Sequence, residues 1–290
     1  MPASSTVSSS NNCNYYSTAS ESTSNKERKK LGDGCYHIYL DVGANIGVHT
    51  RFLYEPTKYP KAWAARKVFE REFGTGRNNS DFCSFGFEPN PVHELRHYKM
   101  MNEYDKVGWR YHYIQAGVSD MSGNITFYHN QDDQHVEEVG FSNQDRIWGK
   151  GKHGIPVTVP TIRLSTWLKD EILDRKIPDT IHGVYNETGP KVVMKMDIES
   201  SEYRVLPDLM FTGILCKTVD FLFGETHNWP IDYDADPNTG RGELHLQKGR
   251  SQQFLRNGIK LFQSFRDCKT RIEELDDEAY LHDGVPFPLE

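Results

Sequence analysis

Apolar residues in this chain are concentrated in short runs, and polar or amphipathic segments lie between them. The runs fall at 35–41, 82–88, 111–115, 191–196 and 218–223. Runs of about four to eight largely apolar residues are typical of strands buried inside a parallel sheet. We therefore expect these segments to be the strands of a mostly parallel sheet.

The intervening segments show helical spacing or turn residues. Residues 61–73 place Val68, Phe69 and Phe73 among charged residues, as in an amphipathic helix. The other expected helices are 92–101 after Pro91, 164–173 with Ser165 or Thr166 near its cap, and 252–257 ending at Gly258. The remaining expected strands are an exposed hairpin at 123–128 and 157–162, and a last strand at 259–265. This alternation predicts an α/β fold with helices on both faces of the sheet.

The composition divides the chain into a tail and one domain. Residues 1–30 are dominated by Ser, Thr and Asn, so we expect a disordered tail; a stalk from a longer, membrane-tethered parent is the alternative. Residues 31–290 read as a single domain with insertions near 54–80, 129–156 and 227–249. Since ligands bind beyond the carboxyl ends of parallel strands, the insertions are expected to build the substrate side.

Charge and hydropathy narrow the classes of function. The formal net charge of −7 argues against a nucleic-acid partner, because such proteins use a basic face to neutralise phosphates. Apolar runs are far shorter than the roughly 20 residues that span a bilayer, and the N-terminus lacks the apolar core of a signal peptide. We expect a soluble chain, cytoplasmic by default, and the oligomeric state stays open.

The cysteines are scattered and odd in number. There are five of them, and no two form a C-x-x-C pair. This pattern predicts neither a zinc site nor a disulfide framework. Cys35 and Cys83, which lie in or beside predicted strands, are expected to be small core residues.

A glycine loop follows the first strand. Gly43 and Gly47 lack side chains where the chain and a nucleotide-like ligand approach closely, and Glu88 follows the second strand, where a carboxylate can accept hydrogen bonds from a ribose diol. Asp41 and Glu88 lie 47 positions apart, whereas about 20 is typical of a simple dinucleotide-binding unit. An insertion therefore separates the two motifs.

Ionisable residues follow the next two central strands. Lys195, Asp197 and Glu199 come at the end of one, and Glu225 and His227 at the end of the next, so these five are the candidate catalytic residues. His227 would be a general base, because its unperturbed pKa lies near working pH and a nearby carboxylate can hold its tautomer. The structural alternative is that the acidic residues, including Glu202, favour the positive end of a helix dipole.

Together these motifs resemble the FkbM-type S-adenosylmethionine-dependent methyltransferases. The matching segments are Asp41–Gly47, Phe87–Pro91, Ala116–Asp120 with Gly123–Phe127, Lys195–Glu202 and Gly224–His227. The resemblance spans roughly residues 36–265. It implies a Rossmann-like class I methyltransferase domain with a mostly parallel seven-stranded sheet, and methyl transfer from S-adenosylmethionine to a hydroxyl of a sugar, glycan or small metabolite.

The same resemblance implies roles for individual residues. The loop from Gly43 to Gly47 would hold the amino-acid part of the cofactor, Glu88 its ribose, and Gly117 and Val118 would border its adenine. The full set of implied cofactor residues is Asp41, Gly43, Ala44, Asn45, Gly47, Glu88, Asn90, Gly117 and Val118. One departure is Ser200, which stands where the family usually has glycine; if that position needs positive φ, serine carries a steric cost.

Three alternatives stay open at this stage. In the first, Asp197, Glu199 and Glu225 would bind a divalent cation such as Mg²⁺, but a site without a metal is favoured. A non-catalytic binding or scaffold protein would keep the fold without turnover. A nicotinamide-dependent oxidoreductase is disfavoured because the third glycine of G-x-G-x-x-G is missing. The acceptor is not identified; Trp63, Trp148 and Trp229 would suit stacking on sugar faces but equally suit packing.

Overall fold

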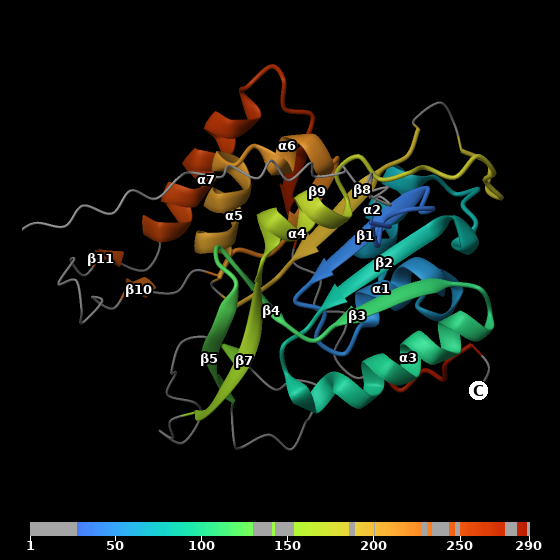
Figure 1. The fold of residues 1–290 in the computed structure, drawn as a ribbon, viewed down its shortest axis with the longest axis horizontal. Coiled ribbons are helices and arrows are strands. Elements are labelled where there is room, and N and C mark those ends of the chain that lie inside the picture. Colours follow the sequence, from blue (N-terminus) through green and yellow to red (C-terminus); the bar gives the residue numbers. More distant parts are fainter. Residues whose placement is uncertain are drawn as a thin grey trace, which may run out of the picture.

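The fold is built on one six-stranded parallel sheet (Figure 1). The computed structural model describes residues 28–129, 141–142, 154–185, 189–199, 201–227, 231–233, 244–246, 250–275 and 283–288. The strands, in spatial order, are β12 (Arg271–Glu274), β9 (Phe221–Gly224), β8 (Val192–Met196), β1 (His37–Val42), β2 (Phe82–Phe87) and β3 (Arg110–Ile114).

Strand order reverses at β1, which has β2 on one side and β8 on the other. The register places Asp41 opposite both Gly86 and Lys195, and Val42 opposite both Phe87 and Met196. The carboxyl ends of β1, β2 and β8 therefore meet at one edge of the sheet. Such a switch point is where ligands bind in open α/β sheets.

Helices cover both faces of the sheet (Figure 1). One face carries α1 (Val48–Tyr54), α2 (Trp63–Phe73) and α3 (Glu94–Lys106), and the other carries α4 (Leu164–Glu171), α5 (Glu202–Phe211), α6 (Ile214–Thr218) and α7 (Arg250–Gln263). Short 3₁₀ turns lie at Pro56–Lys58, Asn79–Asp81 and Pro91–His93. Side chains of β1 alternate between the two cores: Ile38 and Leu40 pack toward α4 and α5, and Tyr39 packs toward α2.

A second, smaller sheet follows β3. Its order is β4 (Gly117–Ser119), β7 (Ile155–Arg163), β5 (Gly123–His129) and β6 (Phe141–Ser142). In Figure 1 β5 and β7 project beyond the main sheet on the side toward which β1 and β2 point. A separate hairpin pairs β10 (Ile231–Tyr233) with β11 (Leu244–Leu246).

The predicted α/β fold is confirmed, and most predicted strands agree with the structure to within one or two residues. The hairpin strands and the amphipathic helix at 61–73 are also confirmed, as β5, β7 and α2. The strand count differs, because the described main sheet has six strands where seven were expected. The strand expected from Thr218 begins at Phe221, since Thr218 ends α6.

The helix predicted at 252–257 is confirmed, but its end at Gly258 and the strand predicted at 259–265 were wrong. A single helix, α7, continues through Gly258, and the strand that follows is β12 at Arg271–Glu274. Leu255 and Phe262 are buried at helical spacing, so burial of this face outweighs the weak helix propensity of glycine. A side chain at Gly258 would meet no atom within 4 Å, which indicates that the glycine is not required there for close packing.

The expectation that the cysteines form no disulfide framework was also wrong, although Cys35 and Cys83 are buried in the core as predicted. Disulfides join Cys35 to Cys83 and Cys216 to Cys268, with Cα atoms 5.5 and 4.7 Å apart. The first links the start of β1 to its neighbour β2, and the second links α6 to the turn before β12. Sequence spacing could not show either pair, because sheet topology brings together residues 48 and 52 positions apart. Within the described residues, the helices are all too short or too polar to span a membrane.

Candidate functional site

The glycine loop after β1 lies directly against the end of β8. Gly43 has φ +81°, and a Cβ there would lie 1.8 Å from the carbonyl oxygen of Asp197. Lys195 donates from Nζ to the Gly43 carbonyl at 3.2 Å. Glycine is therefore required at position 43 both by backbone conformation and by the close approach of two strand ends.

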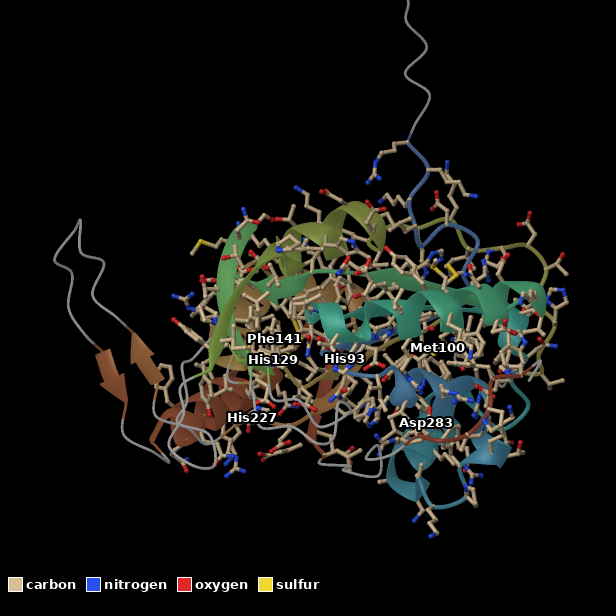
Figure 2. All side chains as sticks on the ribbon, turned by 90° about the horizontal axis from the view of Figure 1, so that it is seen from below. His93, Met100, His129, Phe141, His227 and Asp283 are labelled. Atoms are coloured by element: carbon tan, nitrogen blue, oxygen red, sulfur yellow. A yellow bond between two sulfur atoms is a disulfide. The ribbon has the colours of Figure 1, made fainter. Side chains whose placement is uncertain are left out.

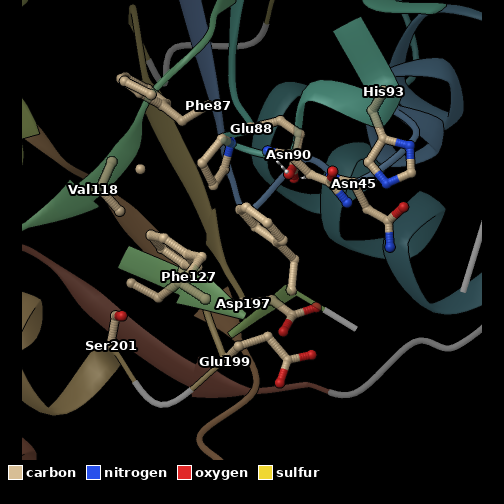
Figure 3. Close-up of a pocket in the computed structure, with 16 residues that line it drawn as sticks. Asn45, Phe87, Glu88, Asn90, His93, Val118, Phe127, Asp197, Glu199 and Ser201 are labelled. Atoms are coloured by element: carbon tan, nitrogen blue, oxygen red, sulfur yellow. Dashed lines mark hydrogen bonds between the residues drawn. The ribbon is translucent and has the colours of Figure 1, made fainter. Parts of the chain in front are cut away.

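Glu88 joins the glycine loop to the segment after β2. Asn45 N donates to one carboxylate oxygen and Asn90 N to the other, each at 2.8 Å. Figure 3 shows the Glu88 carboxylate between Asn45 and Asn90. Burial raises the pKa of Glu88 to about 7, against the two backbone N–H groups, which lower it. The carboxylate is thus held in one orientation at the edge of the cavity.

Residues of α3 hold the loop from the other side, and the sequence analysis did not identify them. The carbonyl of Asn45 contacts His97 Nε2 at 2.6 Å, and Arg96 donates to the carbonyl of Ile46 at 2.7 Å. Tyr111 OH contacts His97 Nδ1 at 2.7 Å, which fixes the imidazole. The sequence signal was slight: two basic residues following the F-E-P-N-P motif.

A cavity of about 670 Å³, counting its open mouth, lies between the strand ends and the small sheet. Its lining residues are Gly43, Asn45, Phe87, Glu88, Pro89, Asn90, His93, Ala116, Gly117, Val118, Phe127, Phe141, Asp197, Ile198, Glu199 and Ser201. Figure 3 shows apolar side chains on one side of the cavity and the carboxylates of Asp197 and Glu199 near its lower edge.

The small sheet supplies the apolar wall. The rings of Phe127 and Phe141 stack with centroids 4.8 Å apart and an interplanar angle of 5°. Val118 lies beside them, and Gly117 allows this approach, since a Cβ there would meet Phe127 at 3.3 Å. Val118 and Gly117 were predicted from the resemblance, whereas both phenylalanines were missed because their contact depends on how the strands pair.

A cluster of carboxylates surrounds one imidazole at the ends of β8 and β9. His227 Nε2 lies 3.7 Å from Asp197, 3.7 Å from Glu199 and 3.9 Å from Glu225. Lys195 ion-pairs with Asp197 at 3.1 Å. The structure therefore brings all five candidate catalytic residues together. His227 lies well away from Asp283 in Figure 2, on the side of the molecule that carries the small sheet.

Residues at the start of α5 position this imidazole. Glu202 Oε1 accepts from the Ile198 N–H at 2.7 Å and contacts His227 Nδ1 at 3.1 Å. The Tyr203 hydroxyl donates to the His227 carbonyl at 2.6 Å. Glu202, weighed before as an acidic residue at a helix start, thus orients the histidine directly.

The charges in the cluster stabilise one another. Burial lowers the pKa of His227, but the hydrogen bond to Glu202 and the charges of Glu202, Glu199 and Asp197 outweigh it and raise that pKa to about 9. Burial likewise opposes ionisation of Asp197, yet the charges of Lys195 and His227 lower the pKa of its carboxyl group. The pKa of Lys195 is raised because the charges of Asp197 and Asp41 outweigh its burial.

The remaining predicted residues lie around the cavity or outside it. Asp41 is fully buried beneath the loop, where Thr50 donates to it at 3.1 Å, and burial raises its pKa to about 6. Ala44 and Gly47 belong to the loop but are not lining residues, and Gly47, at φ +77°, directly precedes α1. Ser200 lies outside the described residues, as do Trp148, Trp229 and the side chain of Trp63.

The cavity has polar groups suited to an adenosine-containing cofactor. Asn45 Oδ1 and Asn90 Nδ2 are buried and have no hydrogen-bond partner in the described part of the protein. Both asparagines line the cavity beside Glu88. Because buried polar groups normally have partners, these atoms fit a ligand that carries both hydroxyl and amino groups. S-Adenosylmethionine has this donor and acceptor set.

The sheet carries a glycine loop at its switch point and a carboxylate after the next strand, with a cavity between them. This arrangement defines a Rossmann-like protein of the class that binds adenosine-containing cofactors. A family model for the methyltransferase FkbM domain matches residues 41–236. Since that match covers more than half of the sequence, the chain belongs to the FkbM methyltransferase family.

Comparison with other known proteins adds little detail. The curated proteins contain no match to this chain. Among solved structures, the crystal structure of methyltransferase FkbM from Methylobacillus flagellatus KT matches with 14% identity and a TM-score of 0.28, over 63% of this chain and 30% of that one. The chain thus matches less than a third of that protein's length.

Proposed function

We propose that this protein is an S-adenosylmethionine-dependent O-methyltransferase that acts on a hydroxyl of a sugar, a glycan or a small metabolite. The observation that carries the proposal is the orientation of Glu88 by Asn45 and Asn90 at one side of the cavity that Asp197 and Glu199 line at the other. A ribose site and an acidic acceptor site then share one cavity.

Each part of the cofactor has a matching set of residues. Glu88 would accept hydrogen bonds from the ribose hydroxyls, which suits an acceptor-only carboxylate. The loop at Gly43 and Asn45 would hold the amino-acid part, and Val118 with Phe127 would cover the adenine. When bound there, the cofactor supplies an activated methyl group and its own leaving group.

The acceptor would meet the carboxylates of Asp197 and Glu199. Both line the cavity, so a hydroxyl entering it can donate a hydrogen bond to either. Lys195 holds Asp197 in place, and His227 lies behind both carboxylates. As the acceptor oxygen gains the methyl group its proton becomes strongly acidic, so the Asp197 carboxylate can accept it despite its lowered pKa.

Calorimetric titration of the full chain with S-adenosylmethionine, and separately with NADH, tests the cofactor assignment. We expect micromolar binding of the methyl donor, at least tenfold weaker binding in Glu88→Ala, and no binding of NADH. Glu70→Gln is a matched control, because Glu70 lies on α2 and pairs there with Arg66. Absence of donor binding would contradict the proposal.

Turnover separates an enzyme from a binding protein with the same fold. A panel of hydroxylated acceptors, beginning with mono- and oligosaccharides, is incubated with labelled donor. We expect label in an acceptor with the native chain and loss of at least 100-fold in Asp197→Asn. Donor binding without transfer to any acceptor would favour the non-catalytic alternative.

A further inference from the structure

We propose that Asp197, Glu225 and His227 bind a divalent cation beside the cavity. One ligand atom from each lies within 4.8 Å of the other two. The separations of His227 Nε2 from Asp197 Oδ1 and Glu225 Oε2, 3.7 and 3.9 Å, exceed hydrogen-bond range. Two ligands about 2.1 Å from a shared ion lie about 3 to 4 Å apart, so these separations fit a common ion.

The histidine has the second contact that metal-bound imidazoles have. Glu202 fixes Nδ1 at 3.1 Å, which directs Nε2 toward Asp197 and Glu225. Glu202 is itself held by the Ile198 N–H, and the Tyr203 hydroxyl fixes the His227 backbone. A carboxylate that orients an imidazole from behind is typical of metal sites and strengthens the ligand.

Glu202 adds a buried negative charge behind the imidazole, which favours positive charge at this place. It is 1% exposed, and its second oxygen, Oε2, has no hydrogen-bond partner among the described residues. A buried carboxylate normally has a donor on each oxygen or a nearby positive charge. Without a metal ion, the protonated His227 balances this charge. A cation bound at Nε2 would replace the proton there and take over the balance, while Nδ1–H stays directed at Glu202.

The donor set indicates which ion. Two carboxylates and one imidazole favour Mn²⁺ or Mg²⁺ over the thiolate-preferring metals, and the nitrogen donor favours Mn²⁺ of the two. Glu199 lies 3.7 Å from His227 Nε2 and lines the cavity, so its carboxylate is placed to give a further oxygen ligand.

The role of the ion rests on the proposed function. Asp197 lines the cavity, so an ion that it binds lies next to an acceptor hydroxyl. A divalent cation lowers the pKa of a hydroxyl beside it and orients its oxygen. Under this inference, methyl transfer requires a bound divalent cation, which a site made of carboxylates alone would not need.

The test measures Mn²⁺ binding to the full chain without cofactor, by the loss of the electron paramagnetic resonance signal of free Mn²⁺. We expect one ion per chain. Binding is expected to be at least tenfold weaker in Glu225→Gln and His227→Gln, and about 10 to 100-fold weaker in Glu202→Gln. Glu202→Gln keeps an oxygen that can accept from the Ile198 N–H and removes the negative charge beside His227 Nδ1. Glu225→Gln is informative because that side chain is 35% exposed and its replacement spares the core.

Two controls separate this inference from the proposed function. Glu70→Gln and Glu88→Ala are expected to bind Mn²⁺ as the native chain does. Failure of the native chain to bind Mn²⁺ below about 1 mM, or unchanged binding in both Glu225→Gln and His227→Gln, overturns the cation site. If the chain binds Mn²⁺ but not S-adenosylmethionine, the cation site is supported and the methyltransferase proposal is contradicted. If the chain binds S-adenosylmethionine but not Mn²⁺, the methyltransferase proposal is supported and the cation site is contradicted.

Discussion

Arg51 and Asp283 form an ion pair 2.8 Å long in which both side chains are fully buried, although 232 positions separate them. Arg51 also donates to the carbonyls of Val285 and Pro286, so the segment 283–288 is fixed against α1. Arg96 pairs with the same Asp283 carboxylate and donates to the carbonyl of Ile46 in the glycine loop. The C-terminal segment is thereby connected to the proposed cofactor site.

Replacement of Asp283 is expected to be strongly destabilising. Asp283→Asn removes one of the two buried carboxylates that pair with Arg51, and the other, Glu55, remains at 2.9 Å. We therefore expect a loss of about 2 to 3 kcal/mol, less than when a buried charge is left with no partner. Urea unfolding of the full chain measures the loss. Glu273→Gln is the matched control, because Glu273 pairs with Arg71 at 2.9 Å on the surface, where the loss should stay below about 1 kcal/mol. Equal losses in the two variants would contradict the buried pairing.

Gly43→Ala should damage both stability and cofactor binding. Positive φ alone costs alanine about 1 to 2 kcal/mol, and the new Cβ would also lie 1.8 Å from the Asp197 carbonyl. Gly108→Ala isolates the first effect, because Gly108 has φ +75° with no atom within 4 Å of a Cβ. We expect Gly43→Ala to lower the unfolding free energy by clearly more than Gly108→Ala does, and only Gly43→Ala to abolish S-adenosylmethionine binding. Similar behaviour of both variants would refute the close approach.

Binding of S-adenosylmethionine should strengthen as pH rises from 6 to 8. Glu88 has a pKa of about 7 in the free protein, so it is protonated at the lower pH and an acceptor on both oxygens at the higher one. Affinity should rise by up to about tenfold across this window. Glu88→Gln serves as the reference, because titration of the cofactor itself is common to both proteins. A pH profile that is the same in both would exclude a role for this carboxyl group.

The same group should make the free protein less stable as pH rises. Its pKa is raised above the ordinary value of 4.5, so the folded state retains a proton that the unfolded chain has released between about pH 4.5 and 7. Above pH 7, the buried and ionised Glu88 is therefore expected to lower the free energy of unfolding by roughly 3 kcal/mol relative to its value below pH 4.5. Denaturant unfolding at pH 5.5 and 8, compared between the native chain and Glu88→Gln, measures this contribution.

Reduction of the disulfides should lower stability. They close loops of 48 and 52 residues, and loops of this length are worth about 4 kcal/mol in the chain-entropy estimate. The denaturant midpoint is expected to fall on adding dithiothreitol. In the double variant Cys35→Ser/Cys83→Ser, which keeps one disulfide, dithiothreitol should lower the denaturant midpoint by less than it does in the native chain. Thiol titration of the unreduced, denatured chain should detect at most one of the five cysteines; five reactive thiols would contradict both pairings.

Local patterns determined much of the fold and part of the candidate site. The apolar runs predicted β1, β2 and β8 because a strand that is buried on both faces of a sheet is largely apolar. Gly43 and Glu88 were found because close approach and positive φ restrict one position to glycine, and the end of the next strand faces the same ligand crevice. Each of these sequence signals consists of a strand and the few residues that directly follow it.

What only the tertiary structure decided depends on contacts between distant segments. The helix α7 was misread because the burial of Leu255 and Phe262 against other elements, and not the local propensity of Gly258, fixes its length. The disulfides, the support of the glycine loop by His97, and the stacking of Phe127 on Phe141 all join residues that strand order brings together. Pairing and packing choose such partners from many chemically equivalent ones, so the sequence by itself specifies the side chains available for the site and the folded sheet specifies which of them meet.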